Sequence, residues 1–172
     1  EYTSVKPHQL SSARLAELVT EIVVKEQPIH QEEVGRRLAN TFRLQRSGSR
    51  IQAAALEGLK YAARQGLLNS KGKYWRSAPG TTVTPRDRSN LPSTSSLRKI
   101  EMICPTELAA AMKEVLKQSL ALDTQELITE SARALGFART GGDISAAMKK
   151  ALQTELRDAI RADHLGRIQL IE

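Results

Sequence analysis

Aromatic residues make up only 3% of this 172-residue chain, and Cys104 is its single cysteine. One cysteine can form neither an internal disulfide nor a structural zinc site, which needs several Cys or His ligands. No apolar run approaches the roughly 18 residues of a membrane-spanning helix, and no secretory signal opens the chain. We therefore expect a cytoplasmic protein with no membrane partner. Because its first residue is Glu1 rather than Met, we also expect a piece of a longer protein.

Catalytic motifs are also missing from the sequence. The phosphate-binding pattern G-x-x-x-x-G-K-[ST] is absent, and the three histidines, His8, His30 and His164, are scattered. His30 suits a helix start better than the role of a catalytic base. Asp87 lies between two arginines, has no second carboxylate at a useful spacing, and is expected to form a salt bridge in a loop. We predict a chain with no enzymatic activity, cofactor or metal ion of its own.

What the chain does contain is an internal duplication. Residues 15–64 align without a gap with residues 108–157, at an offset of 93 positions. Twelve of the 50 aligned positions are identical, and in the first copy they are Leu15, Ala16, Glu21, Glu33, Ala39, Arg46, Gly48, Ile51, Ala53, Ala54, Leu59 and Arg64. Shared composition alone does not produce this many matches, so the two copies are expected to have the same fold.

In the first copy, Leu and Ala at helical spacing predict three helices. The first begins after Ser11 or Ser12 and ends at Pro28, the second runs from His30 or Gln31 to residues 41–44, and the third opens after residues 46–49 and runs to Gly66. Two short apolar runs then flank the polar loop 69–73, which indicates a hairpin. Pro28-Ile29 is expected to add a short strand, and Trp75 to pack beneath the third helix rather than stack on a base.

The second copy predicts the same elements from different residues. Pro105 and Thr106 start its first helix, Asp123 and Glu126 form a capping box, and Gly141-Gly142 opens the third helix. A weaker hairpin follows at residues 161–171.

Three helices followed by a hairpin is the element order of a winged helix-turn-helix. We therefore predict a mainly α fold made of two tandem winged-helix-turn-helix-like repeats with short β-hairpin wings. The predicted domains are residues 1–78, a partly ordered linker at 79–103, and residues 104–172. In the linker, Val83 and residues 97–103 alternate as strands would, and we expect this segment to pack one module on the other.

Positive charge is concentrated in the first half of the chain. Residues 1–90 contain 15 Lys and Arg against 8 Asp and Glu, whereas residues 91–172 contain 11 of each kind. A basic copy beside a neutral copy indicates an anionic partner for the first. The alternative is a solvated basic face that only aids solubility.

The turn that leads into the third helix of the first copy is the strongest candidate for a phosphate site. Backbone amides at a helix start are unpaired, a glycine lets an anion approach, and arginines supply charge. In a helix-turn-helix the next helix enters the major groove, and the wing grips the flanking backbone. The candidate nucleic-acid-binding residues are Arg43, Arg46, Ser47, Gly48, Ser49, Arg50, Gln52 and Lys60, with Lys71 and Lys73 on the wing. Glu57 is a further outward position on the third helix. Arg36 and Arg37 on the second helix would add to the positive electrostatic potential.

A purely structural role for this turn remains an alternative, in which Gly48 only permits a tight turn and the arginines cap carbonyls or pair with Glu32 and Glu33. The second copy supplies an internal comparison, because Arg50 becomes Asp143 and Arg43 becomes Gly136. A carboxylate at a helix start stabilises the helix but repels phosphate. We therefore expect the second copy to serve packing or partner contact.

Several motifs together resemble one particular domain family. They are residues 28–34 (PIHQEEV), 46–51 (RSGSRI), 72–75 (GKYW), 86–88 (RDR) and 136–141 (GFARTG). The chain resembles an uncharacterised domain at the C-terminal end of very large bacterial superfamily 1 helicase-like proteins, often just after a Vsr-type, restriction-endonuclease-like nuclease domain. It departs from the pattern at Gly142-Asp143, where a second Ser-Arg would stand.

The resemblance implies an accessory module of an ATP-dependent helicase and nuclease, in a class that includes anti-phage defence systems. We therefore expect a non-catalytic module that binds nucleic acid, DNA in preference to RNA, and that has the helicase and nuclease domains of a parent protein as partners. The alternative is a module for protein docking or oligomerisation within the same parent protein.

Overall fold

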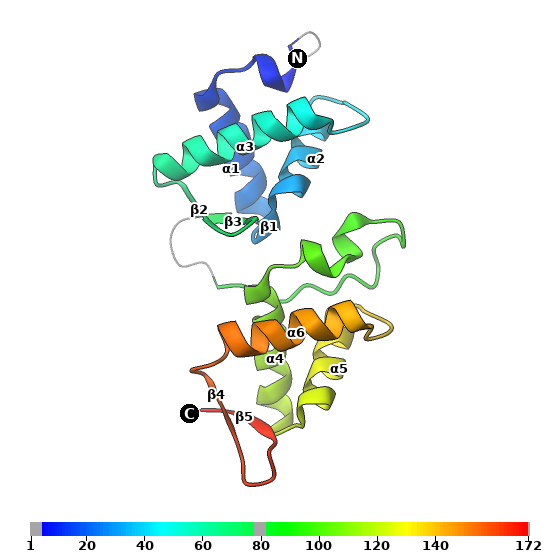
Figure 1. Cartoon of the computed structure of the whole chain (residues 1–172). Coiled ribbons are helices and arrows are strands. Elements are labelled where there is room, and N and C mark those ends of the chain that lie inside the picture. Colours follow the sequence, from blue (N-terminus) through cyan, green and yellow to red (C-terminus); the bar gives the residue numbers. More distant parts are fainter. Residues whose placement is uncertain (1–4, 78–81, 172) are drawn as a thin grey trace. The chain divides into compact units, whose positions relative to one another are not determined.

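The computed structural model describes residues 5–77 and 82–171. The chain divides into two compact units, Glu1–Thr82 and Val83–Glu172, and each has its own hydrophobic core. The described residues form six α-helices and two small antiparallel sheets (Figure 1). The prediction of a mainly helical fold is therefore confirmed.

The helices of the first unit begin and end where local signals place them. In chain order its elements are η1 (Pro7–Gln9), α1 (Ser12–Glu26), β1 (Ile29–His30), α2 (Gln31–Thr41), α3 (Ser49–Arg64), β2 (Leu68–Lys71) and β3 (Tyr74–Ser77). The hydroxyl of Ser11 accepts a hydrogen bond from the amide of Arg14 at 3.3 Å and caps α1. Just beyond α3, Gly66 has a φ of 73°, the left-handed conformation that glycine favours. The predicted helices of this copy are confirmed.

A three-stranded antiparallel sheet closes one end of the first unit. Its strand order is β1-β3-β2, with Ile29 opposite Trp75 and Leu68 opposite Ser77. The short strand after Pro28 and the hairpin are thus both present, as predicted. Trp75 is 5% exposed and belongs to the core, so the prediction that it packs in the interior is confirmed, and its strand contacts α1.

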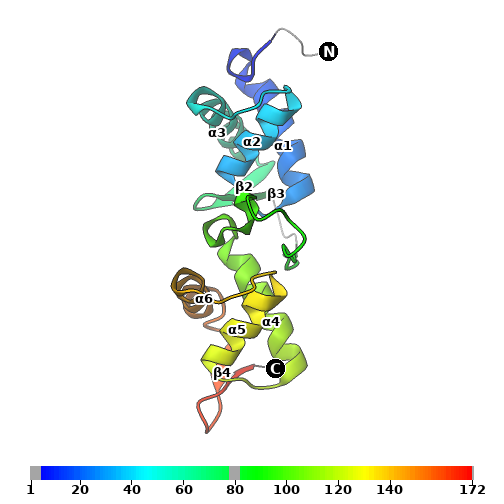
Figure 2. The same cartoon turned by 90° about the vertical axis from the view of Figure 1, so that its right-hand side faces the viewer.

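The core of the first unit lies between its helices and the inner face of the sheet (Figure 2). Helices α1, α2 and α3 all contact one another, and β3 packs on α1. At the crossing of α1 and α3, a Cβ on Gly58 would lie 2.9 Å from the backbone carbon of Leu15. Only glycine therefore allows these two helices to approach so closely.

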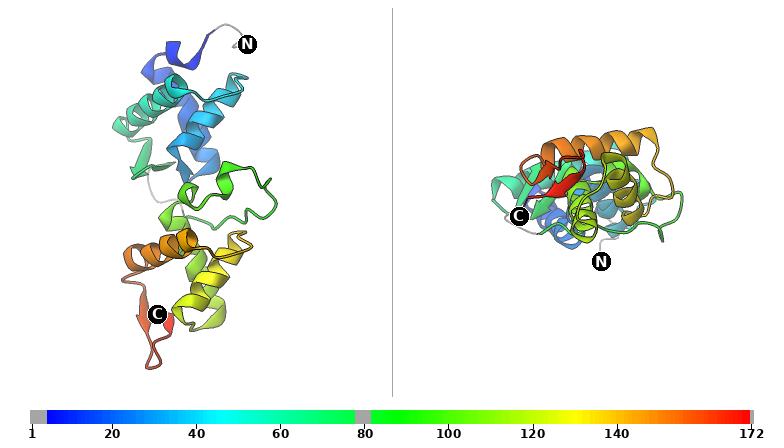
Figure 3. Two further views of the ribbon diagram at one scale, coloured as in Figure 1. Left: turned by 45° about the vertical axis from the view of Figure 1, so that its right-hand side comes forward. Right: turned by 90° about the horizontal axis from the view of Figure 1, so that it is seen from below.

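The second unit has the same kinds of elements around a separate core. They are η2 (Ser96–Arg98), η3 (Ile100–Met102), α4 (Pro105–Ser119), α5 (Thr124–Ala134), α6 (Gly142–Glu155), β4 (Ile160–Ala162) and β5 (Ile168–Leu170). Figure 3 shows the β4–β5 hairpin beside one end of α4, with which β5 is in contact. The predicted capping box is present, because Asp123 accepts from the amide of Glu126 at 2.8 Å and Glu126 accepts from the amide of Asp123 at 3.3 Å.

The helices of the two units follow the same order at a constant offset. Helices α4, α5 and α6 and the turn η3 each begin 93 positions after α1, α2, α3 and η1. The Ile29–Trp75 pair of the first unit corresponds at this offset to an isolated bridge between Leu122 and Ile168 in the second. The hairpin register differs by one residue, because Arg161 lies opposite Gln169 whereas its counterpart Leu68 lies opposite Ser77. The offset found in the sequence is thus also the offset between matching helices.

The strands predicted at Val83 and at residues 97–103 are wrong. Val83 has no regular structure, and η2 and η3 occupy the second segment. Their backbone bonds are local, with the amide of Lys99 donating to Ser96 at 3.0 Å and the amide of Ile103 donating to Ile100 at 3.1 Å. A short alternation of apolar and polar residues fits a 3₁₀ turn as well as a strand, and no strand among the described residues pairs with it here.

Residues 83–103, which we predicted as linker, belong to the compact second unit, while residues 79–81 lie outside the described part of the chain. A buried ion-pair cluster holds this segment to α4. The carboxylate of Glu107 is completely buried and accepts from Nη2 of Arg86 at 2.7 Å and from Nη2 of Arg88 at 2.9 Å. It also accepts from the backbone amide of Arg86 at 3.0 Å.

The salt bridge predicted for Asp87 is not found among the described residues. Its carboxylate instead accepts from the amide and the hydroxyl of Ser89, at 2.8 and 3.0 Å. The flanking arginines pair with Glu107, which lies about 20 positions further along the chain. A contact at that distance in sequence leaves no local pattern.

Candidate nucleic-acid interface

The turn between α2 and α3 carries an arginine in a backbone conformation that usually belongs to glycine. Arg43 has a φ of 55° and directly follows the C-cap of α2. Its amide donates to Asn40 at 2.9 Å, and the next amide, of Leu44, donates to Ala39 at 3.0 Å, which is the Schellman pattern. The second unit has the same two bonds with Gly136 at the corresponding position. The first unit therefore keeps a long cationic side chain at a strained site.

The start of α3 presents unpaired cations and unpaired amides. Arg43, Arg46 and Arg50 are exposed, and none of them forms a hydrogen bond or ion pair through its side chain within residues 5–77. Gly48 is the N-cap and offers no side-chain cap, unlike Ser11 of α1. The amides of Gly48, Ser49 and Arg50 have no acceptor among those residues. This arrangement is suited to an anion.

One face of α3 continues this basic surface. The exposed residues Arg50, Ala53, Glu57, Lys60 and Arg64 follow one another at spacings of three and four, so they lie on one side of the helix. The carboxylate of Glu57 accepts a hydrogen bond from the hydroxyl of Ser12. Arg64, which is not among the predicted site residues, lies over the ring of Tyr61 at 5.5 Å and is exposed.

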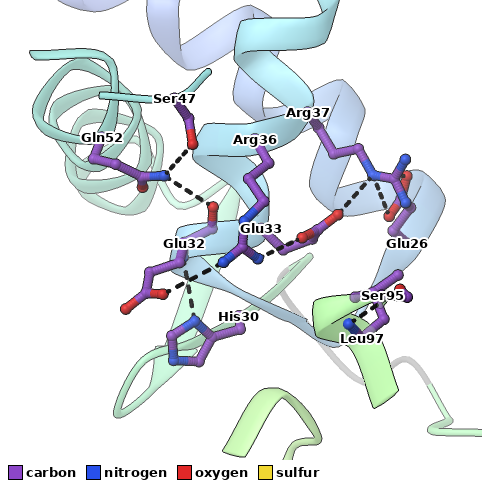
Figure 4. Close-up of polar contacts among 10 residues, drawn as sticks. All are labelled: Glu26, His30, Glu32, Glu33, Arg36, Arg37, Ser47, Gln52, Ser95 and Leu97. Carbon is purple, nitrogen blue, oxygen red and sulfur yellow. Dashed lines mark hydrogen bonds and ion pairs between the residues drawn. The ribbon is translucent and has the colours of Figure 1, made fainter. Parts of the chain in front are cut away.

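Gln52 does not lie on that exposed face. It is half-buried, and its amide donates to the backbone carbonyl of Glu32 at 3.1 Å and to the hydroxyl of Ser47 at 3.0 Å (Figure 4). A Cβ on Gly35 would lie 2.2 Å from the Gln52 side-chain oxygen, so α2 comes very close to this side chain. In this structure Gln52 connects α2, the turn and α3, and Ser47 is one of its partners.

Arg36 and Arg37 of α2 are neutralised by acidic neighbours. Nη1 of Arg36 lies 2.8 Å from Glu33, and Nε of Arg37 lies 3.0 Å from Glu26 and 3.2 Å from Glu33 (Figure 4). Glu33 is only 5% exposed, so this cluster forms part of the packing of α2. Pairing of arginines with Glu33 is thus observed, but it involves α2 and not the arginines that precede or open α3.

The wing and the start of α2 are joined. Lys71 and Lys73 are exposed on either side of Gly72, and the carbonyl of Lys73 accepts from the amide of Gln31 at 2.8 Å. His30 caps α2, because its Nδ1 accepts from the amide of Glu32 at 3.2 Å. The prediction that His30 marks a helix start is confirmed.

A surface pocket lies beside the start of α3, which we call the α3 pocket. It has a volume of ≈ 550 Å³ and is lined by Lys6, His8, Leu44, Gln45, Arg46, Gly48, Ser49, Arg50 and Ile51. Sequence reasoning missed Lys6 and His8, which reach the site because η1 packs on α3. No signal in the sequence marks them, since they precede the first helix and follow no periodic pattern.

The corresponding part of the second unit has a different charge. Residues 42–77 contain eight Lys and Arg and one acidic residue, whereas the matching residues 135–170 contain six Lys and Arg and four acidic residues. Gly141 is the N-cap of α6 and, like Gly48, has no capping side chain, but Asp143 stands where α3 has Arg50. The two helix starts therefore share a backbone and differ in electrostatics.

Two other features are absent from the described part of the chain. None of its helices combines the length and the apolar character needed to cross a membrane. Residues 5–77 and 82–171 also contain no group of three or more His, Cys, Asp or Glu side chains placed to hold a metal ion.

Comparison with known proteins gave one match. A family model described as "Protein of unknown function (DUF3320)" matches residues 6–53. Neither the curated proteins nor the solved structures contain a match to this chain. The matched stretch includes η1, α1, α2 and every residue that lines the α3 pocket. Over these residues, the chain is similar to a family of proteins of unknown function.

Proposed function

We propose that the two units are winged-helix-turn-helix-like repeats and that the first binds nucleic acid, DNA in preference to RNA, as a non-catalytic module. The element order of three helices and a hairpin in both units, with a short third strand in the first, supports the fold assignment. The observation that carries the function is the start of α3, where three exposed arginines and three backbone amides have no partner within residues 5–77. A polyanion supplies the partners that these groups lack.

In the proposed complex, α3 lies along a groove with its basic face toward the backbone. Arg43, Arg46 and Arg50 contact phosphates at its start, and Lys60 and Arg64 continue along the same helix. Lys71 and Lys73 on the wing contact the nucleic-acid backbone beside that groove. Gln52 acts as a positioning residue for the turn, because its amide already has two partners in the protein.

Arg43 supports this assignment through its strain. A left-handed conformation costs an ordinary residue roughly 1–2 kcal/mol, and glycine avoids that cost. The second unit, whose surface is nearly neutral here, has Gly136 at this position. A cation kept at a position where glycine is more stable points to a role outside the fold.

The second unit lacks this basic start and is assigned to partner contact. Its exposed apolar residues include Leu120, Leu165 and Ile171, with exposed fractions of 82%, 65% and 49%. They favour the second candidate function, a docking or oligomerisation module. The resemblance to the C-terminal domain of helicase-like proteins makes the helicase and nuclease domains of a larger protein the proposed partners, with phage defence as the proposed setting.

The test of the proposed function is fluorescence anisotropy of the whole chain with labelled duplex, forked and single-stranded DNA over a range of salt concentrations. For duplex DNA, log K should fall with log salt by about 0.9 for every phosphate contacted. A docking surface of Leu side chains responds little to salt. Absence of binding at low salt, or binding that does not weaken with salt, would contradict the proposal.

Arg43→Gly is expected to stabilise the fold and weaken DNA binding at once. Removing the left-handed strain should raise the free energy of unfolding by about 1 kcal/mol. Removing one phosphate-binding side chain should flatten the salt slope by about 0.9. Thermal unfolding and anisotropy measure the two effects, and Arg43→Lys, which keeps the charge and the strain, is the control. If the glycine variant binds DNA as tightly as the wild type, Arg43 does not contact the DNA.

A further inference from the structure

The α3 pocket brings together cations from two distant segments. Lys6 and His8 come from the η1 segment, and Arg46 and Arg50 come from the segment around the start of α3. Lys6, His8, Arg46 and Arg50 are all exposed, and none pairs with an acidic group through its side chain within residues 5–77. Three full positive charges and one imidazole thus surround a single hollow.

Part of the remaining lining of the pocket is apolar, although Gln45 and Ser49 are polar. Leu44 and Ile51 line it and are half-buried against the core of the first unit. At ≈ 550 Å³ the hollow is larger than a phosphate group needs, and it can hold the sugar or base attached to one. Charge on part of the wall and apolar surface on another part match a nucleotide better than a bare anion.

The second unit provides a comparison at the same backbone positions. The counterparts of Lys6 and Arg46 are Lys99 and Arg139, so two of the cations are present in both units. The other two positions differ, because Glu101 replaces His8 and Asp143 replaces Arg50. With His8 neutral, these four positions carry a net charge of +3 in the first unit and of zero in the second.

We propose that the α3 pocket binds the phosphomonoester of a nucleotide, either at the end of a nucleic-acid strand or free in solution. A phosphomonoester carries about −1.5 to −2 charges at pH 7, whereas an internal phosphodiester carries one. Three cations around one hollow favour the more highly charged group. For a strand end, this inference rests on the proposed function.

The test compares oligonucleotides that differ only at their ends. Whole-chain anisotropy is measured with one short labelled DNA that ends in a 5′-phosphate, a 3′-phosphate or hydroxyl groups, and AMP is compared with adenosine by calorimetry. One of the phosphorylated ends should bind about tenfold more tightly than the hydroxyl end, as one or two charge-assisted hydrogen bonds allow. AMP should bind and adenosine should not.

Lys6→Gln with His8→Gln removes the ammonium group and the imidazole from the pocket and leaves the arginines of the turn in place. This double variant should lose the preference for the phosphorylated end and still bind the hydroxyl-ended DNA in a salt-dependent way. Lys25→Gln, at an exposed position in the last turn of α1, removes a cation outside the pocket and should keep the preference.

The outcomes separate this inference from the proposed function. Equal affinity for all three ends, with salt-dependent binding intact and no binding of AMP, would overturn the pocket assignment alone. Binding of AMP with no binding of any oligonucleotide would support the pocket and overturn the proposed function. If neither AMP nor any end binds, both are overturned.

Discussion

Glu107→Gln is expected to destabilise the second unit by about 3–5 kcal/mol, the cost of breaking one side of a buried ion pair. The wild-type carboxylate is fully buried and lies 2.7 Å from Nη2 of Arg86 and 2.9 Å from Nη1 of Arg88. The side chain of Arg88 is 8% exposed, so its charge would remain buried without a counter-charge. A loss of this size is comparable to the whole stability of a unit this small.

The loss should appear in thermal and denaturant unfolding followed by circular dichroism. Tryptophan fluorescence reports on unfolding of the first unit, because the only tryptophan, Trp75, lies there. Glu130→Gln is the matched control. It removes an ion pair of 2.6 Å with Arg133 at the surface, and such exposed pairs contribute about 0–1 kcal/mol. Equal effects of the two substitutions would show that the buried cluster is not important for stability.

The same cluster gives the wild type a pH dependence that the variant should lack. Burial raises the pKa of the Glu107 carboxyl, but hydrogen bonds from Arg86 and Arg88 outweigh it, and the pKa is lower than usual. The lowered pKa contributes stability above the value of the unfolded chain, about 4.3. This contribution is lost as the pH falls through the pKa of the folded state. Unfolding between about pH 7 and pH 3 should therefore show a steeper decline in the wild type than in Glu107→Gln.

Arg46→Ala with Arg50→Ala is expected to weaken DNA binding by about tenfold or more at low salt and to flatten the salt slope by about 0.9 for each phosphate that the variant no longer binds. Both side chains are exposed and have no acidic partner within residues 5–77, so their removal should leave the fold intact. The reduction should be similar for different DNA sequences, because phosphate contacts carry no sequence information. Anisotropy with several duplexes measures both effects.

Asp143→Ala in the second unit is the matched control for this double variant. Asp143 occupies the position of Arg50 one repeat later and lies in the first turn of α6. Removing its carboxylate should change DNA affinity little, since that helix start carries no comparable cluster of cations. An unchanged affinity in the arginine double variant would defeat the assignment of the α3 start as a phosphate site.

The helices could be located from the sequence because their signals are local. Ser11 and the Asp123–Glu126 pair cap helices within three residues of themselves, and Gly66 takes the left-handed conformation that ends α3. The hairpin of the first unit was equally accessible, since its turn glycine and flanking apolar residues are adjacent in sequence. The offset of 93 between matching helices could likewise be found by aligning the two halves of the chain.

Contacts between distant residues could not be predicted in this way. Glu107 pairs with two arginines about 20 positions earlier, and the segment between them adopts 3₁₀ turns where alternation indicated strands. Gln52 was expected to face solvent, but its amide is held by Glu32 and Ser47. A helical period gives the angle of a side chain around its own helix and does not give the position of the neighbouring helix.

For the candidate site too, some features follow from the sequence and others only from the tertiary structure. The sequence alone determined the arginines of the turn, the uncapped glycine before α3 and the contrast with the second copy, because each is a property of residues close together in the chain. Only the tertiary structure decided which cations stay unpaired, since Arg36 and Arg37 meet buried Glu33 while Arg46 and Arg50 meet solvent. It alone also brought Lys6 and His8 to the start of α3, because packing of η1 on that helix joins segments that no local pattern connects.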